Sequence, residues 1–396
     1  MTESKLVEAL DRLGSPSSAP DGWPRLGFLR NPFPTKSSPI WNVFHNQAAV
    51  RDRFYADLVE FLKAPNPTTT LFITGGNRVG KTHFMEHHRR ALPALLESRG
   101  TVLPTAVVSA EFANFERLYL DIVDQIAECV HLQTGSTLFH QPAIQVSNLP
   151  PGDFRRALEQ LEQAIGDDRD RVRTLLAGWV RGERLRLTQR RELGVIGLLD
   201  SPSQIQNTFG GLVRYLRSCA FDQGSSGASR TCPGVLVFVD EFELVWRHRR
   251  DRRDQFLQSL RALVDECAEG GLFLCVGMAT GLGPDVADLE GDYPALFARM
   301  KGDREIPALL EIESSLVGIE YAREFERYGR QEFLAAGQRS SANLPSSELF
   351  NQREIDAYFR EMVGSAHGAT VTQADFFDRL HLEAEVRRKQ IAGSAR

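Results

Sequence analysis

Blocks of apolar and polar positions predict strands and helices in alternation along this chain. Apolar runs predict buried strands within residues 66–76, at 105–112, at 234–240 and at 271–277. Apolar residues at helical spacing predict helices between these strands, for example from residue 80 or 81 to about 97 and over 253–269. Strands that alternate with helices are typical of an α/β fold, with a parallel sheet covered on both faces.

The remaining segments are mostly helical in pattern. A short helix is predicted at 3–13, followed by a loop rich in Gly, Pro and Ser. Between about 133 and 200, charged helical segments interrupt the strand pattern, and residues after about 312 are helical to the end. We therefore expect an N-terminal helix and linker (1–44), an α/β core (45–312) with a helical insert at about 133–200, and a C-terminal helical lid (313–396).

The segment GGNRVGKT, which follows the first predicted strand, fits the phosphate-loop pattern G-x-x-x-x-G-K-[ST]. Such a loop needs glycines for close approach of backbone N–H groups to phosphate, a lysine for the outer phosphates and a hydroxyl for Mg²⁺. The predicted ligands of the nucleotide are Gly75, Gly76, Asn77, Arg78, Val79, Gly80, Lys81, Thr82 and His83. Arg78 and Val79 are larger than the residues of many such loops.

A second motif overlaps the first. Residues His83 to His87 fit H-x-x-E-H, a zinc-peptidase pattern. The helix that follows a phosphate loop is buried against the sheet, whereas the two histidines of a zinc site need open access to the metal. The sequence favours the phosphate loop, with His87 and His88 at the surface or in packing contacts.

An acidic pair follows the third predicted strand. In GVLVFVDEFELVW, apolar residues lead to Asp240 and Glu241 at the strand's carboxyl end, where parallel sheets place their ligands. We expect Asp240 to hold Mg²⁺ together with Thr82, and Glu241 to act as the base that activates water. The guanine-reading element requires an Asn-Lys dipeptide, which this chain lacks, so ATP is the expected nucleotide.

Two further residues are candidates for catalysis. Thr280 follows the strand 271–277 and could orient water or sense the outer phosphate, although a plain strand-end threonine fits nearly as well. Arg299 precedes a short strand candidate and could reach the nucleotide of a neighbouring subunit. Arg304 competes for this role, and a surface or salt-bridged arginine is the alternative for both.

The composition limits the class of protein. A net charge of −5, 42% hydrophobic residues and 25% charged residues are ordinary for a soluble globular protein. Apolar runs such as 235–239 and 272–279 fall short of the roughly 20 residues that cross a bilayer, and the N-terminal residues lack the order of a signal peptide. Five cysteines without a C-x-x-C pair indicate neither a disulfide scaffold nor a thiolate zinc site. We expect a cytoplasmic protein.

The phosphate loop, Asp240-Glu241, Thr280 and Arg299 together resemble the AAA+ P-loop ATPases, especially the origin-recognition-like branch, over roughly 45–390. The insert is similar to the BrxD-like ATP-binding proteins of BREX-type phage-defence loci. The matching residues there are Trp179, Gly182, Glu183, Arg191, Leu193 and Gly194. The resemblance implies an ATP- and Mg²⁺-dependent hydrolase of the AAA+-like P-loop NTPase fold, acting in an oligomer with partner proteins in antiviral defence. A lid arginine of the kind expected after residue 370 is missing.

Arginine clusters leave contact with double-stranded DNA open. Residues 246–253 carry five arginines and residues 169–191 carry eight, but only six of the 47 basic residues are lysines, so arginine is the usual cation of this chain. Interleaved acids make solvated helix faces the simpler interpretation of both clusters. Three functions remain: an ATP-driven switch or motor in a DNA-directed defence machine, a nucleotide-gated scaffold without hydrolysis, and a replication or transposition regulator that assembles on DNA.

Overall fold

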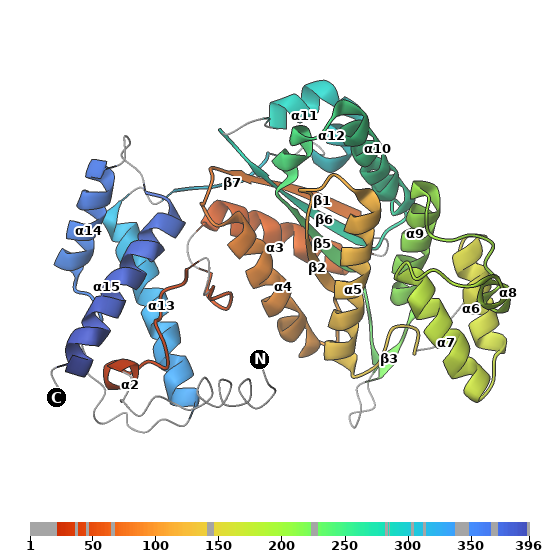
Figure 1. Ribbon diagram of the computed structural model, residues 1–396, viewed down its shortest axis with the longest axis horizontal. Coiled ribbons are helices and arrows are strands. Elements are labelled where there is room, and N and C mark those ends of the chain that lie inside the picture. The colour runs from red at the N-terminus through yellow and green to blue at the C-terminus, as the bar shows by residue number, and fades with distance from the viewer. Residues whose placement is uncertain are drawn as a thin grey trace, which may run out of the picture. The chain divides into compact units, whose positions relative to one another are not determined.

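A five-stranded parallel sheet organises the larger of two structural units (Figure 1). The computed structural model describes residues 22–35, 39–44, 47–64, 68–140, 146–222, 229–281, 284, 286–301, 305–311, 314–336, 348–365 and 371–393. One unit is Gln47–Leu310, and the other combines Met1–Asn46 with Glu311–Arg396. The helix predicted at 3–13 lies outside the described residues.

The strand order of the sheet is β2-β5-β6-β1-β7. These strands are β1 Thr68–Gly75, β2 Thr105–Ser109, β5 Val235–Asp240, β6 Leu272–Ala279 and β7 Ala308–Leu309. Helix α3 Ala48–Lys63 precedes β1. The helices that follow the strands include α4 Lys81–Glu97, α5 Phe115–Thr134, α10 Arg250–Glu266, α11 Val286–Asp292 and α12 Pro294–Lys301, with the 3₁₀ segment η3 Phe242–Arg247 before α10. A two-stranded antiparallel ribbon joins β3 Phe221–Asp222 to β4 Ser229–Arg230.

Both faces of the sheet are covered, which explains its continuous apolar strands. Every residue of β5 and β6 is buried. The ring of Phe54 on α3 lies 5.8 Å from that of Phe238 on β5, while Phe72 on β1 meets Phe297 of α12 across the other face. Figure 1 accordingly shows α3 and α4 on one side of the sheet and α10 to α12 on the other. The predicted α/β fold with a parallel sheet, a helical insert and a C-terminal helical unit is confirmed.

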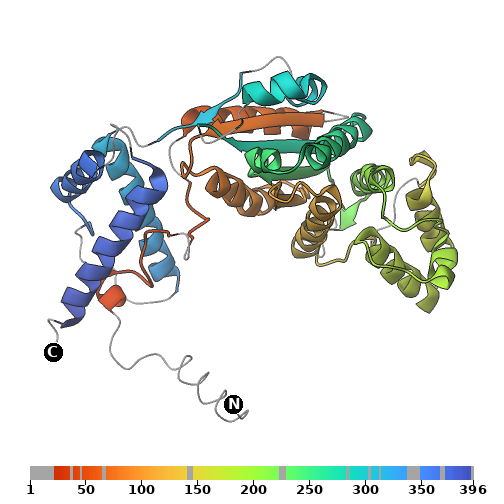
Figure 2. The ribbon, with the colours of Figure 1, turned by 45° about the horizontal axis from the view of Figure 1, so that its top comes forward.

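The helical insert packs beside α5, next to the β2 edge of the sheet (Figure 2). It contains η1 Val146–Asn148, α6 Asp153–Gln163, α7 Asp167–Val180, α8 Leu187–Leu193 and α9 Pro202–Ser218. Trp179 is 1% exposed, and its indole N–H donates to the Gly197 carbonyl over 3.3 Å. Gly194 ends α8 at a φ of 73°, in the left-handed region that glycine adopts most easily. Of the residues that carry the family resemblance, Trp179 therefore belongs to the core of the insert and Gly194 to one of its turns.

The second unit is a helical bundle formed from both ends of the chain. Its helices are α2 Gly22–Leu26, α13 Ser315–Ala335, α14 Gln352–Ser365 and α15 Gln373–Gly393. Trp23, Phe28 and Phe33 are buried in one apolar cluster with Phe325 and Phe376. Residues 22–35 and 39–44, expected to belong to a linker, instead supply part of this core.

Taken over all described helices, none is both long enough and apolar enough to cross a membrane.

A buried histidine of α4 makes the core sensitive to acid. His88 is 1% exposed; its Nδ1 donates to the Phe84 carbonyl over 2.7 Å and its Nε2 accepts from the Tyr55 hydroxyl over 3.3 Å. Burial lowers the pKa of His88 from 6.5 to about 3. Below pH 6.5 the imidazole of His88 is therefore protonated in the unfolded chain but stays neutral in the folded chain until the pH approaches 3. The free energy of unfolding consequently decreases as the pH drops below 6.5.

We expect the wild type to lose about 2 kcal/mol more stability than His88→Gln between pH 7.5 and pH 5, because each pH unit below the unfolded pKa costs up to about 1.4 kcal/mol. Denaturant unfolding at both pH values measures this. Equal losses in the two proteins would contradict the assignment.

Candidate nucleotide-binding site

The predicted phosphate loop joins the carboxyl end of β1 to the first residue of α4. A Cβ atom on Gly75 would lie 2.8 Å from both the Leu309 carbonyl oxygen and Val79 Cγ2, so only glycine fits there. Val79 is fully buried, which accounts for the larger residue at this position. Arg78 is exposed and has a φ of 64°, and Gly80 caps α4 at a φ of 99° without a side-chain hydrogen bond. The first N–H groups of α4 consequently open onto the loop.

Lys81 lies inside the curve of this loop. Its Nζ donates to the carbonyl oxygens of Gly75 (3.1 Å) and Gly76 (2.7 Å), and the residue is 9% exposed. Burial lowers the pKa of Lys81, and the carboxylates of Glu243 and Asp240 partly oppose that shift. The Lys81 ammonium group thus contacts only carbonyl oxygens of the loop in these two hydrogen bonds. A bound anion at this position would neutralise its charge.

Thr82 and Asp240 connect the loop to the acidic strand end. The Thr82 hydroxyl donates to Asp240 Oδ2 over 2.5 Å, although the two residues come from α4 and β5. Asp240 is 6% exposed, and burial raises its pKa. Gly277 on the intervening strand β6 leaves room for this contact, since a Cβ there would lie 3.3 Å from Asp240 Oδ1 and 2.3 Å from Met85 Cε. A hydroxyl and a carboxylate in contact are oxygen ligands suited to Mg²⁺.

Glu241 is at the rim of the site in a left-handed conformation, with a φ of 57°. Its N–H donates to Asp240 Oδ1 over 2.9 Å, and its Oε2 accepts from the Ser109 hydroxyl over 2.8 Å. Left-handed non-glycine residues store strain of about 1 kcal/mol or more and concentrate at functional sites. In this structure the Glu241 carboxylate is therefore held by the end of β2.

Glu243 is a further acid that the sequence analysis missed. Its Oε2 accepts from the N–H of Ala279, the last residue of β6, over 2.9 Å, and its charge acts on Lys81. The available signal was the spacing D-E-x-E, which places a second glutamate two residues after Glu241, in the first turn of η3.

Thr280 contacts the phosphate loop, whereas Arg299 lies away from it. The Thr280 N–H donates to the Gly75 carbonyl over 3.0 Å. The backbone carbonyl of Arg299 accepts a hydrogen bond from the Thr70 hydroxyl. Thr70 is five residues before Gly75 on β1, so at about 3.3 Å per residue the two residues are about 16 Å apart along the strand. The Arg299 side chain forms an ion pair with Asp265 of α10. It does not contribute to the site of its own chain, and Arg304 lies outside the described residues.

The residues of the overlapping zinc motif are side by side on α4, but its glutamate is already engaged. Glu86 Oε2 accepts from Arg89 Nε over 2.9 Å and pairs with Arg90. His83 and His87 are half-buried on the same helix.

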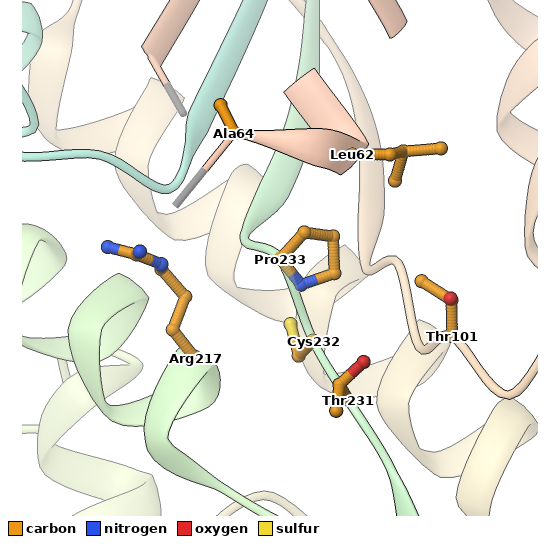
Figure 3. A pocket seen from close by; sticks show the side chains of 7 residues that line it. All are labelled: Leu62, Ala64, Thr101, Arg217, Thr231, Cys232 and Pro233. Carbon is orange, nitrogen blue, oxygen red and sulfur yellow. The ribbon is translucent and has the colours of Figure 1, made fainter. Parts of the chain in front are cut away.

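A cavity of about 290 Å³ lies at the opposite, amino-terminal edge of the sheet. In Figure 3 the Arg217 guanidinium is on one side of Pro233, whereas Thr101 and Thr231 are on the other. These polar groups do not converge on one point, so we do not assign the cavity to nucleotide binding.

Residues 140–303 match the family model described as BREX system ATP-binding protein BrxC/D. This match confirms the predicted resemblance over the insert, Asp240-Glu241 and β6; the phosphate loop lies before it. No curated protein matches the chain.

Solved structures show distant similarity. The Aeropyrum pernix ORC1 protein in complex with DNA has 12% identity and a TM-score of 0.42, with 88% of this chain and 62% of that chain covered. The Aeropyrum pernix ORC2 protein in ADPNP–ADP complexes has 13% identity and a TM-score of 0.40, with coverages of 86% and 67%. A Walker-type ATPase of Pyrococcus abyssi has 14% identity and a TM-score of 0.32, with coverages of 93% and 78%. The chain thus spans less than two thirds of the length of ORC1.

Proposed function

We propose that this protein binds and hydrolyses ATP at residues 75–83, and that the ATP cycle drives a switch in a DNA-directed machine for anti-phage defence. The observation that carries the proposal is the Thr82–Asp240 contact, which joins the phosphate loop to the acidic strand end. The similarity of residues 140–303 to ATP-binding proteins of the BREX system supports ATP as the nucleotide and partner proteins of a defence system as the context.

The residues take the roles expected from their chemistry. The loop N–H groups and Lys81 would hold the phosphates, and Thr82 and Asp240 would hold Mg²⁺. Mg²⁺, when bound, would neutralise charge on the phosphate oxygens. Glu241 would accept a proton from the attacking water after its carboxylate leaves Ser109, and Thr280 would help to orient that water.

A nucleotide-gated scaffold is the second candidate. The Glu241–Ser109 hydrogen bond favours it, because it engages one oxygen of the carboxylate that would act as the base. A homo-oligomer also belongs to the proposal, but Arg299 would first have to break its pair with Asp265 to reach a neighbouring subunit.

Steady-state release of phosphate from ATP, with and without double-stranded DNA, tests the proposal. We expect Mg²⁺-dependent turnover whose rate changes when DNA is added. Tight ATP binding without turnover under both conditions would favour the scaffold, and the absence of ATP binding would refute both functions.

A further inference from the structure

Four exposed arginines follow the acidic strand end at the same edge of the sheet as the candidate site. Arg247 ends η3, Arg249 caps α10, and Arg250 and Arg252 belong to the first turn of α10. We call these four residues the α10 arginine surface. The adjacent Arg253 turns away from it, toward the rings of Trp246 and Tyr293.

Ion pairing distinguishes this surface from three arginines of the other cluster. In the insert, Arg171 pairs with Glu192 (2.6 Å), Arg173 with Asp170, and Arg181 with Asp124. Within the part of the chain that the structure describes, Arg247 and Arg249 form no ion pair, and Arg250 is 86% exposed with only a 3.6 Å contact to Asp254. Asp251 is the exposed acid among the four arginines. Arg171, Arg173 and Arg181 of the insert are thus paired with acids of the chain, whereas the α10 arginine surface has more arginines than acids and keeps a net positive charge.

The backbone at this surface also favours an anion. Arg249 caps α10 without a side-chain hydrogen bond, so the first N–H groups of a 17-residue helix emerge among the arginines. Arginine guanidinium groups and helix N–H groups are the usual contacts to phosphate oxygens of a nucleic acid.

The neighbouring loop is attached to both the surface and the candidate site. The Glu111 carbonyl accepts from His248 Nε2 over 2.6 Å, and the Ala113 carbonyl accepts from Arg252 Nε over 3.3 Å. Two residues earlier, Ser109 donates to Glu241. A ligand on the α10 arginine surface would therefore contact the loop that holds Glu241.

One face of the exposed aromatic ring of this loop, Phe112, is already covered. The Arg117 guanidinium lies 3.9 Å above the ring of Phe112. Binding of single strands relies on aromatic rings that stack on bases, whereas contact with the backbone of a duplex does not. We infer that the α10 arginine surface binds the phosphate backbone of double-stranded DNA without reading its sequence. This inference rests on the proposed role in a DNA-directed machine.

Fluorescence anisotropy of a labelled DNA duplex, titrated at several salt concentrations, tests the inference. Each lost phosphate contact should reduce the slope of log K against log salt by about 0.9. We expect Arg247→Ser/Arg249→Ser to lower the slope by about 1.8 and to weaken binding by roughly 10- to 100-fold at about 0.1 M salt. Arg171→Ser is the matched control, since it removes an exposed but ion-paired arginine.

An unchanged slope in the double variant, an equal loss in Arg171→Ser, or tighter binding of single-stranded nucleic acid than of the duplex would overturn the inference. ATP affinity, measured by calorimetry on the same proteins, separates this result from the proposed function. The double variant should bind ATP like the wild type, while absent ATP binding in the wild type would count against the nucleotide site alone.

Discussion

Lys81→Ala should abolish ATP binding. Lys81 is the cation inside the phosphate loop, and its Nζ already lies within 3.1 Å of two loop carbonyl oxygens. Alanine leaves the outer phosphates facing the carboxylates of Asp240 and Glu243 without a compensating charge at this position. Isothermal calorimetry measures the affinity.

The control for this change is Lys63→Ala, which removes an exposed lysine at the end of α3. The thermal unfolding midpoints of both variants should show that they are folded. Micromolar ATP affinity retained by Lys81→Ala would refute the assignment of the loop.

Glu241→Gln should preserve ATP binding and reduce turnover by a factor on the order of 10² or more, because the amide cannot accept the proton of the attacking water. The variant keeps the side-chain length and an oxygen that can accept from Ser109. Phosphate release at saturating ATP gives the turnover, and calorimetry gives the affinity.

Glu243→Gln is the informative companion, since Glu243 is also an acid near Lys81. If Glu241 is the base, Glu243→Gln should retain more turnover than Glu241→Gln. The opposite order would move the catalytic role to Glu243 and leave Glu241 as a strained structural residue.

The elements with the strongest patterns could be predicted well from the sequence. The helix expected to run from residue 80 or 81 to about 97 is α4, Lys81–Glu97, because a phosphate-loop glycine marks its start. The predicted strand 105–112 is wrong in its last three residues. The Ala110 N–H still donates to the Asp240 carbonyl as the last bond between β2 and β5, but the Glu111 N–H then donates to the Ser109 hydroxyl and Ala113 adopts a φ of 41°, so the chain leaves the sheet. The strand β2 ends where its partner β5 ends, at Asp240, and local propensity does not contain this pairing.

In the candidate site, too, motif spacing predicted some residues, while others depend on tertiary packing. Motif spacing predicted that Thr82 and Asp240 would meet, because both follow the carboxyl ends of parallel strands. It did not identify Glu243, whose position depends on the 3₁₀ geometry of η3 and on the end of β6. For Arg299, chain order alone suggested a role at an interface, while the pairing with Asp265 arises from the packing of α12 against α10.

The helical unit built from both chain ends has a consequence for synthesis on the ribosome. Trp23 and Phe28 emerge early, but the cluster that buries them includes Phe325 and Phe376. At roughly 5–20 residues per second, translation of the intervening unit Gln47–Leu310 takes on the order of 10–50 s. During that time the α/β unit can fold as a continuous segment, whereas these early aromatic side chains have no complete core to enter. The nascent chain thus carries exposed apolar residues ahead of a folding domain, which is the situation in which chaperones engage a polypeptide.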